Sequence, residues 1–429
     1  MATSPIIAMD ADKLSYEIFS LLESKFLFGG GAGCLSSGAC TPARPFHEGR
    51  VRVLSIDGCG SGAGDALLAA AALARLEAGL RKRTGDPDAR VADFFDVAAG
   101  AGAGGVLAAM LFVRGADGRP RYTAEEALEF VASNVGKDWD GRRRGGRWSR
   151  LFRLGGGARK AFRRVFGDAT LKDTVAPLLV PCYDLATSAP FMFSRADAVE
   201  TDAFDFPLRD VCAATCATFA TPVRSLDGRT TLAAASAGVA AMGNPAAAAI
   251  THVLHNKQEF PLATTLDDIL LLSIASTSST PTPAWNTPMH ATRSPSPREL
   301  ARVTAEGVAE MVDESVAMAF AHTGGSNYVR IQASTAAKEV MAQRSVEAAL
   351  FRGRRMSERT NGEKVDDVAG ELVKEHERRR RCSAMMLPNV VIKQVATPRM
   401  SSATTSSSGS TARSVASTLA SPASYGSRQ

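Results

Sequence analysis

Two short glycine-rich segments hold the residues of this 429-residue chain that are best placed for chemistry. The first reads DGCGSG at residues 57–62 and directly follows the apolar run VRVLSI at residues 51–56. Backbone N–H groups of closely spaced glycines after a strand converge on one point, which favours an anion site at the start of the next helix. The anion is either a phosphate or the oxyanion of an acyl-transfer intermediate.

The second segment reads GAGAGG at residues 100–105 and follows another apolar run. Its glycine spacing matches the frame of a nucleophile elbow, G-x-S-x-G, in which the central residue lies in a strained, crowded bend. The outer glycines are present, but the central residue is Gly102, which has no hydroxyl. The pattern therefore predicts the backbone of an elbow without its nucleophile.

Two other interpretations of the first segment stay open at this point. Gly58, Gly60 and Ala63 match the dinucleotide-binding pattern G-x-G-x-x-G/A after a strand. That pattern also requires an acidic residue at the end of a second strand, and the sequence offers no clear candidate. Alternatively, the glycines of the first segment bind nothing. In this alanine-rich chain, small residues can serve only to let helices pack closely on strands.

The segments around these turns indicate an α/β protein. The run at 51–56 has almost no polar alternation, which is typical of a central parallel strand buried on both faces. Strand patterns at 51–56, 94–98 and 266–276 are interspersed with helical patterns at 65–83, 100–113, 122–135 and 298–351, and 230–255 has the pattern of a strand, a turn and a helix. Thr123 is the expected N-cap of the helix at 122–135. This order of strands and helices predicts a mostly parallel sheet with its site at the carboxyl ends of the strands.

Charge and cysteine usage limit the class of protein. The net charge of +6 and pI near 9.0 come largely from basic runs at 142–150 and 378–381. We interpret these runs as a solvated loop and a charged helix end, with attraction to an anionic membrane surface as the alternative, and expect no nucleic-acid partner. Seven cysteines without a CxxC pair indicate reduced thiols in an intracellular protein.

No segment is predicted to cross a membrane. The uncharged stretch at 97–113 is interrupted by glycines and is shorter than the roughly 20 apolar residues a span needs. The N-terminus lacks the pattern of a secretory signal. We therefore expect a cytoplasmic protein, with peripheral membrane association as an alternative.

The chain divides by composition into four parts. Residues 1–50 contain an amphipathic helix at 11–27 and a glycine-rich linker, and residues 51–255 form the core. Residues 256–355 add a strand and helices that complete the domain. Residues 356–429 are predicted to be a charged segment followed by a disordered Ser/Thr-rich tail.

Several blocks together resemble the plant patatin-like proteins, which have the patatin phospholipase fold. The first turn, DGCGSGA at 57–63, is similar to the family's DGGGxRG, and GAGAGG at 100–105 is similar to GTSTGG. The blocks at 181–198 and 208–223 look typical of the plant branch, and 236–256 resembles the block of the catalytic aspartate. The resemblance implies a three-layer α/β fold with a mostly parallel central sheet flanked by helices.

The resemblance also implies a reaction and the positions that carry it. The family uses a Ser–Asp dyad on lipid acyl esters, without a cofactor or metal. Carried over by position, the nucleophile falls on Gly102 and the aspartate on Ser236. The residues of the oxyanion loop fall on Gly58, Cys59, Gly60 and Gly62, with Cys59 in place of a glycine and Gly62 in place of an arginine. Glycine at the nucleophile position implies membership of a plant subgroup with that change.

We therefore expect a lipid acyl hydrolase homologue of the phospholipase A type with a degenerate dyad, inactive or weakly active, whose ligands are phospholipid or galactolipid acyl esters. One alternative is a slow hydrolase that uses Ser61 or Cys59 as a substitute nucleophile. Another is a lipid- or membrane-binding protein without enzymatic activity. His252 and His255 lie three apart on a predicted helix but lack further ligands, so no metal is expected.

Overall fold

The computed structural model describes residues 49–58, 63–135, 156–217, 220–236, 243–275, 296–321, 327–332, 341–349 and 353–385. These residues, apart from Met385, belong to one compact unit, Met1–Ala384. The predicted amphipathic helix at 11–27, the linker at 29–45, the basic loop at 142–150 and the Ser/Thr-rich tail from 397 lie outside the described residues.

An eight-stranded sheet forms the centre of the unit, with strand order β5-β6-β3-β2-β1-β7-β8 and β4 paired to β3. Its strands are β1 (Val51–Ile56), β2 (Val97–Gly100), β3 (Leu178–Asp184), β4 (Ala189–Ser194), β5 (Thr221–Arg224), β6 (Thr231–Ser236), β7 (Ile269–Ile274) and β8 (Tyr328–Ile331). The strands from β3 through β2, β1 and β7 to β8 are parallel, whereas β4, β5 and β6 pair in antiparallel fashion. A separate hairpin pairs β9 (Arg344–Ala349) with β10 (Gly353–Thr360).

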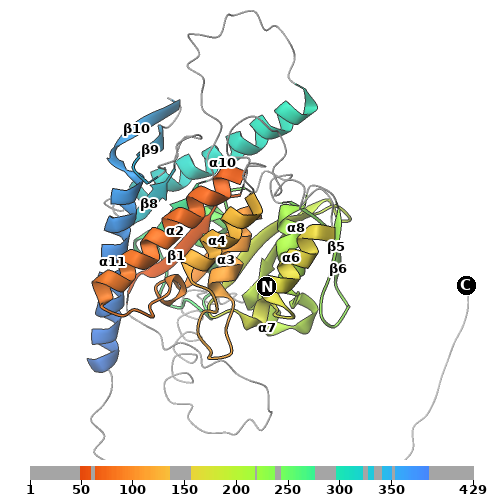
Figure 1. The fold of residues 1–429 in the computed structure, drawn as a ribbon, viewed down its shortest axis with the longest axis horizontal. Coiled ribbons are helices and arrows are strands. Elements are labelled where there is room, and N and C mark those ends of the chain that lie inside the picture. The colour runs from red at the N-terminus through yellow and green to blue at the C-terminus, as the bar shows by residue number, and fades with distance from the viewer. Residues whose placement is uncertain are drawn as a thin grey trace, which may run out of the picture. The chain divides into compact units, whose positions relative to one another are not determined.

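Helices cover both faces of this sheet (Figure 1). They are α2 (Ala63–Thr84), α3 (Gly102–Phe112), α4 (Ala124–Val135), α6 (Gly156–Phe166), α7 (Arg195–Glu200), α8 (Leu208–Cys216), α9 (Ala246–His255), α10 (Pro297–Ala321) and α11 (Asn361–Met385). Helix α4 begins with the predicted cap, because Thr123 Oγ1 accepts a hydrogen bond from Glu126 N and the Glu126 carboxylate accepts one from Thr123 N.

Alternate residues of β1 point into two separate hydrophobic cores. Leu54 and Ile56 belong to the core that includes α2, α3, α4, α8 and α11. Val51 and Val53 belong to the smaller core that includes α9 and α10. A strand buried on both faces needs this unbroken apolar sequence. The prediction of a mostly parallel central sheet between two layers of helices is therefore confirmed.

Helix α3 follows β2 directly and is almost entirely buried. The apolar stretch at 97–113 is thus the buried turn and helix that the sequence predicts. Strand β2 begins at Val97 and not at residue 94, because a short 3-10 helix at Val91–Asp93 precedes it and Phe94 and Phe95 fill the core. No helix in the described ranges is both long and apolar enough to span a bilayer.

The carboxyl-terminal part of the chain differs from the sequence prediction. The helical pattern predicted for 298–351 is wrong beyond Ala321, where β8 and β9 follow α10. The predicted start of the charged tail at residue 356 is too early, since 353–385 form β10 and α11. Helix α11 is rich in charged residues, but one of its faces is apolar and buried in the core. The residues of that face are Val365, Val368, Ala369, Leu372 and Val373.

Candidate functional site

Asp57 and Gly58, the described residues of the first turn, lie next to the second turn at the carboxyl edge of the sheet. Strands β1 and β2 are parallel neighbours, with Ile56 opposite Gly100. The N–H group of Ala101 donates a hydrogen bond to the carbonyl of Ile56 at 3.1 Å. The last residues of the two strands, from which both turns start, are therefore adjacent.

Gly102 lies in the sharp bend between β2 and α3. Its φ is +52°, a left-handed conformation that residues with a side chain adopt only at a cost in strain. An ideal Cβ on Gly102 would lie 2.8 Å from the carbonyl oxygen of Gly58. A side chain at this position would thus start from the bend and point at the first turn, which is the arrangement of a nucleophile elbow.

Gly58 is in close contact with the second turn. An ideal Cβ on Gly58 would lie 1.8 Å from the carbonyl oxygen of Ala101, so only glycine fits here. Its N–H group donates a hydrogen bond to the carbonyl of Gly243 at 2.9 Å. Gly58 is therefore held between the elbow and the segment that leads into α9.

Thr215 of α8 fixes the elbow from the other side. Its buried hydroxyl accepts a hydrogen bond from the N–H group of Gly102 at 2.9 Å and donates one to the carbonyl of Pro181 at 3.0 Å. Because its proton is already donated to Pro181, this hydroxyl is a structural brace and not a replacement nucleophile. The sequence does not indicate this role, since a threonine in a small-residue helix carries no distinctive pattern.

We expect Thr215→Val to lower the free energy of unfolding by about 1–3 kcal/mol, because the isosteric change leaves the Gly102 N–H and the Pro181 carbonyl buried without partners. Thr215→Ser keeps the hydroxyl and should lose less. Urea denaturation of the three proteins measures the effect. Equal losses for the valine and serine variants would show that packing of the methyl group, and not the two hydrogen bonds, matters here.

Ser236 is the last residue of β6, where its backbone pairs with Cys182 of β3. Cys182 follows Pro181, the acceptor of the Thr215 hydroxyl, so β6 ends close to the brace of the elbow. The side chain of Ser236 and residues 59–62, which include Cys59, Gly60, Ser61 and Gly62, lie outside what the structure describes. Their assigned roles therefore stay predictions.

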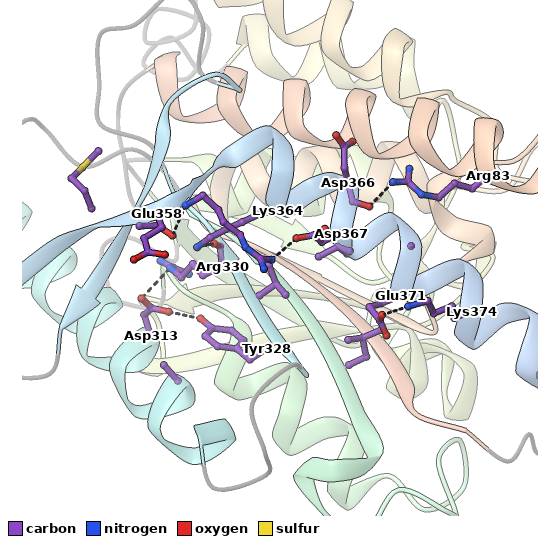
Figure 2. A pocket seen from close by; sticks show the side chains of 18 residues that line it. Arg83, Asp313, Tyr328, Arg330, Glu358, Lys364, Asp366, Asp367, Glu371 and Lys374 are labelled. Atoms are coloured by element: carbon purple, nitrogen blue, oxygen red, sulfur yellow. Dashed lines mark hydrogen bonds and ion pairs between the residues drawn. The ribbon is translucent and has the colours of Figure 1, made fainter.

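A buried ionic cluster lies directly behind the first turn. Arg330 of β8 donates a hydrogen bond from Nη2 to Oδ2 of Asp57 at 2.7 Å, and its Nε lies 3.1 Å from Oδ2 of Asp313 on α10. Arg330 also donates to the hydroxyl of Ser273 at 2.7 Å, and the Tyr328 hydroxyl donates to the Asp313 carboxylate. Figure 2 shows Asp313, Tyr328 and Arg330 turned toward one another.

The cluster connects the edge strand β8 to the residue that precedes Gly58. Burial raises the pKa of Asp57 to about 6, although the neighbouring Arg330 lowers it. Burial lowers the pKa of Arg330, but the carboxylates of Asp57 and Asp313 raise it above its usual value, so Arg330 stays charged. The sequence does not predict this cluster. A lone arginine in the short strand YVRI is a signal for a buried partner, but Asp57 lies 273 positions earlier in the chain, so the sequence does not indicate which partner it is.

Comparison with known proteins agrees with this geometry. The family model described as "Patatin-like phospholipase" matches residues 54–250. The chain is 52% identical to patatin-like protein 3 of Oryza sativa subsp. japonica, over 86% of this chain and 92% of the relative. The chain belongs to the patatin-like family.

Two relatives from Arabidopsis thaliana add detail. The patatin-like chain is 42% identical to patatin-like protein 7, over 90% of this chain and 85% of the relative. It is 40% identical to a protein named "probable inactive patatin-like protein 9", over 85% of this chain and 93% of the relative. The family match over 54–250 spans both glycine turns and Ser236, and it decides against the dinucleotide interpretation of the first turn.

The raised pKa of Asp57 makes the stability of the patatin-like chain depend on pH. Because Asp57 holds its proton more tightly when folded, it stabilises the fold below about pH 4, and this contribution is lost as the pH rises through 6. Relative to Asp57→Asn, wild type should therefore lose about 2–3 kcal/mol of unfolding free energy between pH 4 and 7.5. Urea denaturation of both proteins across this range is the measurement. Parallel stability profiles would contradict the assignment.

The cavity in Figure 2 lies at the edge strand β8 and not at the glycine turns. It has a volume of about 1030 Å³ between β8, β10, α10 and α11. Charged residues at its rim form ion pairs with one another, as Arg359 does with Asp367 and Lys374 with Glu371. We assign no ligand to it.

Metal ligands are not grouped in the part of the chain that the structure describes. His252 lies 3.5 Å from the Glu259 carboxylate, measured from Nε2 to Oε2, and packs edge-on against Phe260. A histidine in such a contact has a structural explanation. The expectation that His252 and His255 form no metal site stays a prediction for the whole chain.

Proposed function

We propose that this patatin-like protein binds lipid acyl esters at its two glycine turns and hydrolyses them very slowly or not at all. The observation that carries the proposal is the conformation of Gly102. It has the backbone bend from which an elbow presents a nucleophile to the first turn, yet it offers no reactive side chain.

The remaining backbone supports binding without fast turnover. The N-terminus of α3 begins at the elbow, so the positive end of the helix dipole lies beside the first turn and favours a carbonyl oxygen or an anionic group. Loss of both nucleophile and base removes about 10⁴-fold or more in rate from hydrolases of this kind. The name of the relative described as probably inactive is consistent with the proposal.

We further propose that the bound lipids are phospholipids or galactolipids, held with Gly58, Cys59, Gly60 and Gly62 around the ester carbonyl. Gly102 and Ser236 then stand at the positions of the lost nucleophile and aspartate. A lipid bound without turnover suits a role in lipid metabolism or signalling at a membrane surface. No cofactor is required for such binding.

Binding of a monomeric lipid tests the proposal. Dihexanoyl phosphatidylcholine below its micellar concentration should bind saturably in a calorimetric titration. Ala103 is half-buried at the start of α3, so Ala103→Phe should weaken this binding about tenfold by placing a ring beside the elbow. Ala74→Phe, at a half-buried alanine in the middle of α2, is the matched control and should bind as wild type.

Absence of saturable binding to wild type, or equal loss in the Ala103 and Ala74 variants, would overturn the proposal. Free fatty acid measured in the same samples reports hydrolysis. The proposal expects no release above the rate without protein.

A further inference from the structure

Arg330 holds the side chain of Asp57 in a buried network. Its Nη2 donates to the carboxylate of Asp57 at 2.7 Å, its Nη1 donates to the hydroxyl of Ser273 at 2.7 Å, and its Nε lies 3.1 Å from the carboxylate of Asp313. The planar guanidinium thus contacts the end of β1, β7 and α10 at once. Lysine has a single ammonium group and cannot reproduce this fork. The network therefore fixes the direction in which the Asp57 side chain points.

Gly58 is tied to the same helix, α10, by a second set of contacts. Its N–H group donates a hydrogen bond to the carbonyl of Gly243 at 2.9 Å. The next residue, Asn244, donates from Nδ2 to the carbonyl of Ala309 on α10 at 3.3 Å. Ala309 and Asp313 are both buried and lie four positions apart, so they are on the same side of α10. Two routes therefore lead from that buried side to the consecutive residues 57 and 58.

The position of Gly58 is critical for the site. An ideal Cβ on Gly58 would lie 1.8 Å from the carbonyl oxygen of Ala101, and its own carbonyl oxygen lies 2.8 Å from an ideal Cβ on Gly102. In enzyme sites, a misplacement of about 1 Å can cost about 10²-fold in rate. The group that holds Asp57 therefore decides whether Gly58 faces the elbow correctly.

Stability alone does not account for the charges at this place. Replacing a buried ionic cluster by apolar residues of similar volume is often neutral or stabilising. Apolar residues fill neighbouring positions on the same face of the sheet, namely Val51 and Val53 of β1 and Leu271 of β7. Oδ1 of Asp57 and Oγ of Ser55 are buried and have no hydrogen-bond partner among the residues that the structure describes. These features favour a role for the cluster in positioning.

We propose that Arg330 is a positioning residue of the lipid site, which holds Gly58 against the elbow through the carboxylate of Asp57. The inference rests on the proposed lipid-binding function and names the group that fixes the geometry of that site. Arg330 acts through Asp57 and not by contact with the lipid.

This role makes lipid binding depend on pH in the direction opposite to stability. In the described part of the chain, the titratable groups that face the Asp57 carboxyl are Arg330 and Tyr328 of β8 and Asp313 of α10. Burial raises the pKa of Asp57 to about 6, so below this pH Arg330 keeps only Asp313 as a charged partner. The hold on Gly58 then weakens, although the same proton stabilises the fold. Lipid affinity should therefore rise as the pH rises through 6.

Calorimetric titration with dihexanoyl phosphatidylcholine below its micellar concentration, at pH 5 and pH 7.5, tests the proposal. The lipid headgroup keeps both of its charges over this range, so a change in affinity comes from the protein. At pH 7.5, Asp57→Asn and Arg330→Lys should each bind about tenfold more weakly than wild type, because a charge-assisted hydrogen bond is lost or displaced. Wild-type affinity should fall about tenfold toward pH 5, whereas that of Asp57→Asn should stay constant.

Leu80→Ala is the destabilised control. Leu80 is fully buried at the end of α2 that is remote from the glycine turns, so its truncation lowers stability without touching the site. This variant should bind the lipid as wild type does at both pH values. The proposal would be overturned by equal affinity of wild type, Asp57→Asn and Arg330→Lys at pH 7.5, by an affinity that falls as the pH rises, or by an equal loss in Leu80→Ala.

Hydrogen exchange at the Gly58 amide separates this inference from the proposed function. Labelling of Asp carbonyl carbons and Gly nitrogens selects the amide signals of the Asp–Gly pairs at 57–58, 117–118, 140–141 and 227–228. Arg330→Lys should speed exchange at Gly58 about tenfold or more, and by more than Leu80→Ala does. Faster exchange at Gly58 without lipid binding to wild type would support the hold of Arg330 and contradict only the proposed function. Lipid binding with affinity and exchange unchanged in Arg330→Lys would contradict only the positioning role.

Discussion

Gly102→Ser combined with Ser236→Asp is expected to raise the rate of ester hydrolysis by about 10³-fold or more over wild type. The bend at residue 102 already has the φ of +52° from which an elbow presents its side chain to the first turn. A serine there costs about 1–2 kcal/mol in backbone strain. Its Cβ would lie 2.8 Å from the Gly58 carbonyl oxygen, so the backbone at Gly58 must move to make room for it.

Hydrolysis of a p-nitrophenyl fatty ester is the measurement for the double variant. Gly102→Ser alone lacks the base and should gain little, because nucleophile and base act as a unit. Gly102→Ala with Ser236→Asp is the matched control, since it brings the same strain and the same carboxylate without the hydroxyl. A folded double variant that is no faster than this control would show that the site has diverged beyond the dyad.

Arg330→Met should cause the largest loss of stability among substitutions of single side chains discussed here. The change leaves the buried carboxylates of Asp57 and Asp313 without their shared cation. Breaking a buried ionic cluster by removing one partner typically costs about 3–5 kcal/mol. The free energy of unfolding from urea denaturation at pH 7 measures this loss.

Arg359→Met is the natural control for Arg330→Met. Arg359 lines the same cavity and pairs with Asp367, but both side chains are exposed. An exposed pair of this kind contributes about 0–1 kcal/mol. If the two variants lost similar stability, the cluster behind the first turn would not have the structural role assigned to it.

The sequence predicts those parts of the fold whose signals are local. The apolar run at 51–56, the glycine turn at 100–105 and the cap at Thr123 each depend on neighbouring residues, and each appears as predicted. Helix α11 was missed because its high charge obscures five buried apolar residues at helical spacing. The two strands after α10 were missed because their runs are short and mixed in polarity.

The candidate site likewise has one part that a local sequence pattern predicts and other parts that depend on long-range contacts. The glycine pattern at 100–105 predicts a bend without a side chain, and Gly102 has the required positive φ. The Thr215 brace and the Arg330 cluster depend on contacts between residues 113 and 273 positions apart. Such contacts are decided by strand order, which no local pattern contains.

The elbow of this protein presents no nucleophile, because Gly102 stands at the bend. Treatment of wild type with a fluorophosphonate, followed by intact-protein mass spectrometry, tests it most directly, because the reagent labels activated serine hydroxyls covalently. We predict no adduct on wild type and one adduct on the variant that combines Gly102→Ser with Ser236→Asp. Stoichiometric labelling of wild type at Ser61, together with ester turnover that Ser61→Ala abolishes, would contradict the account.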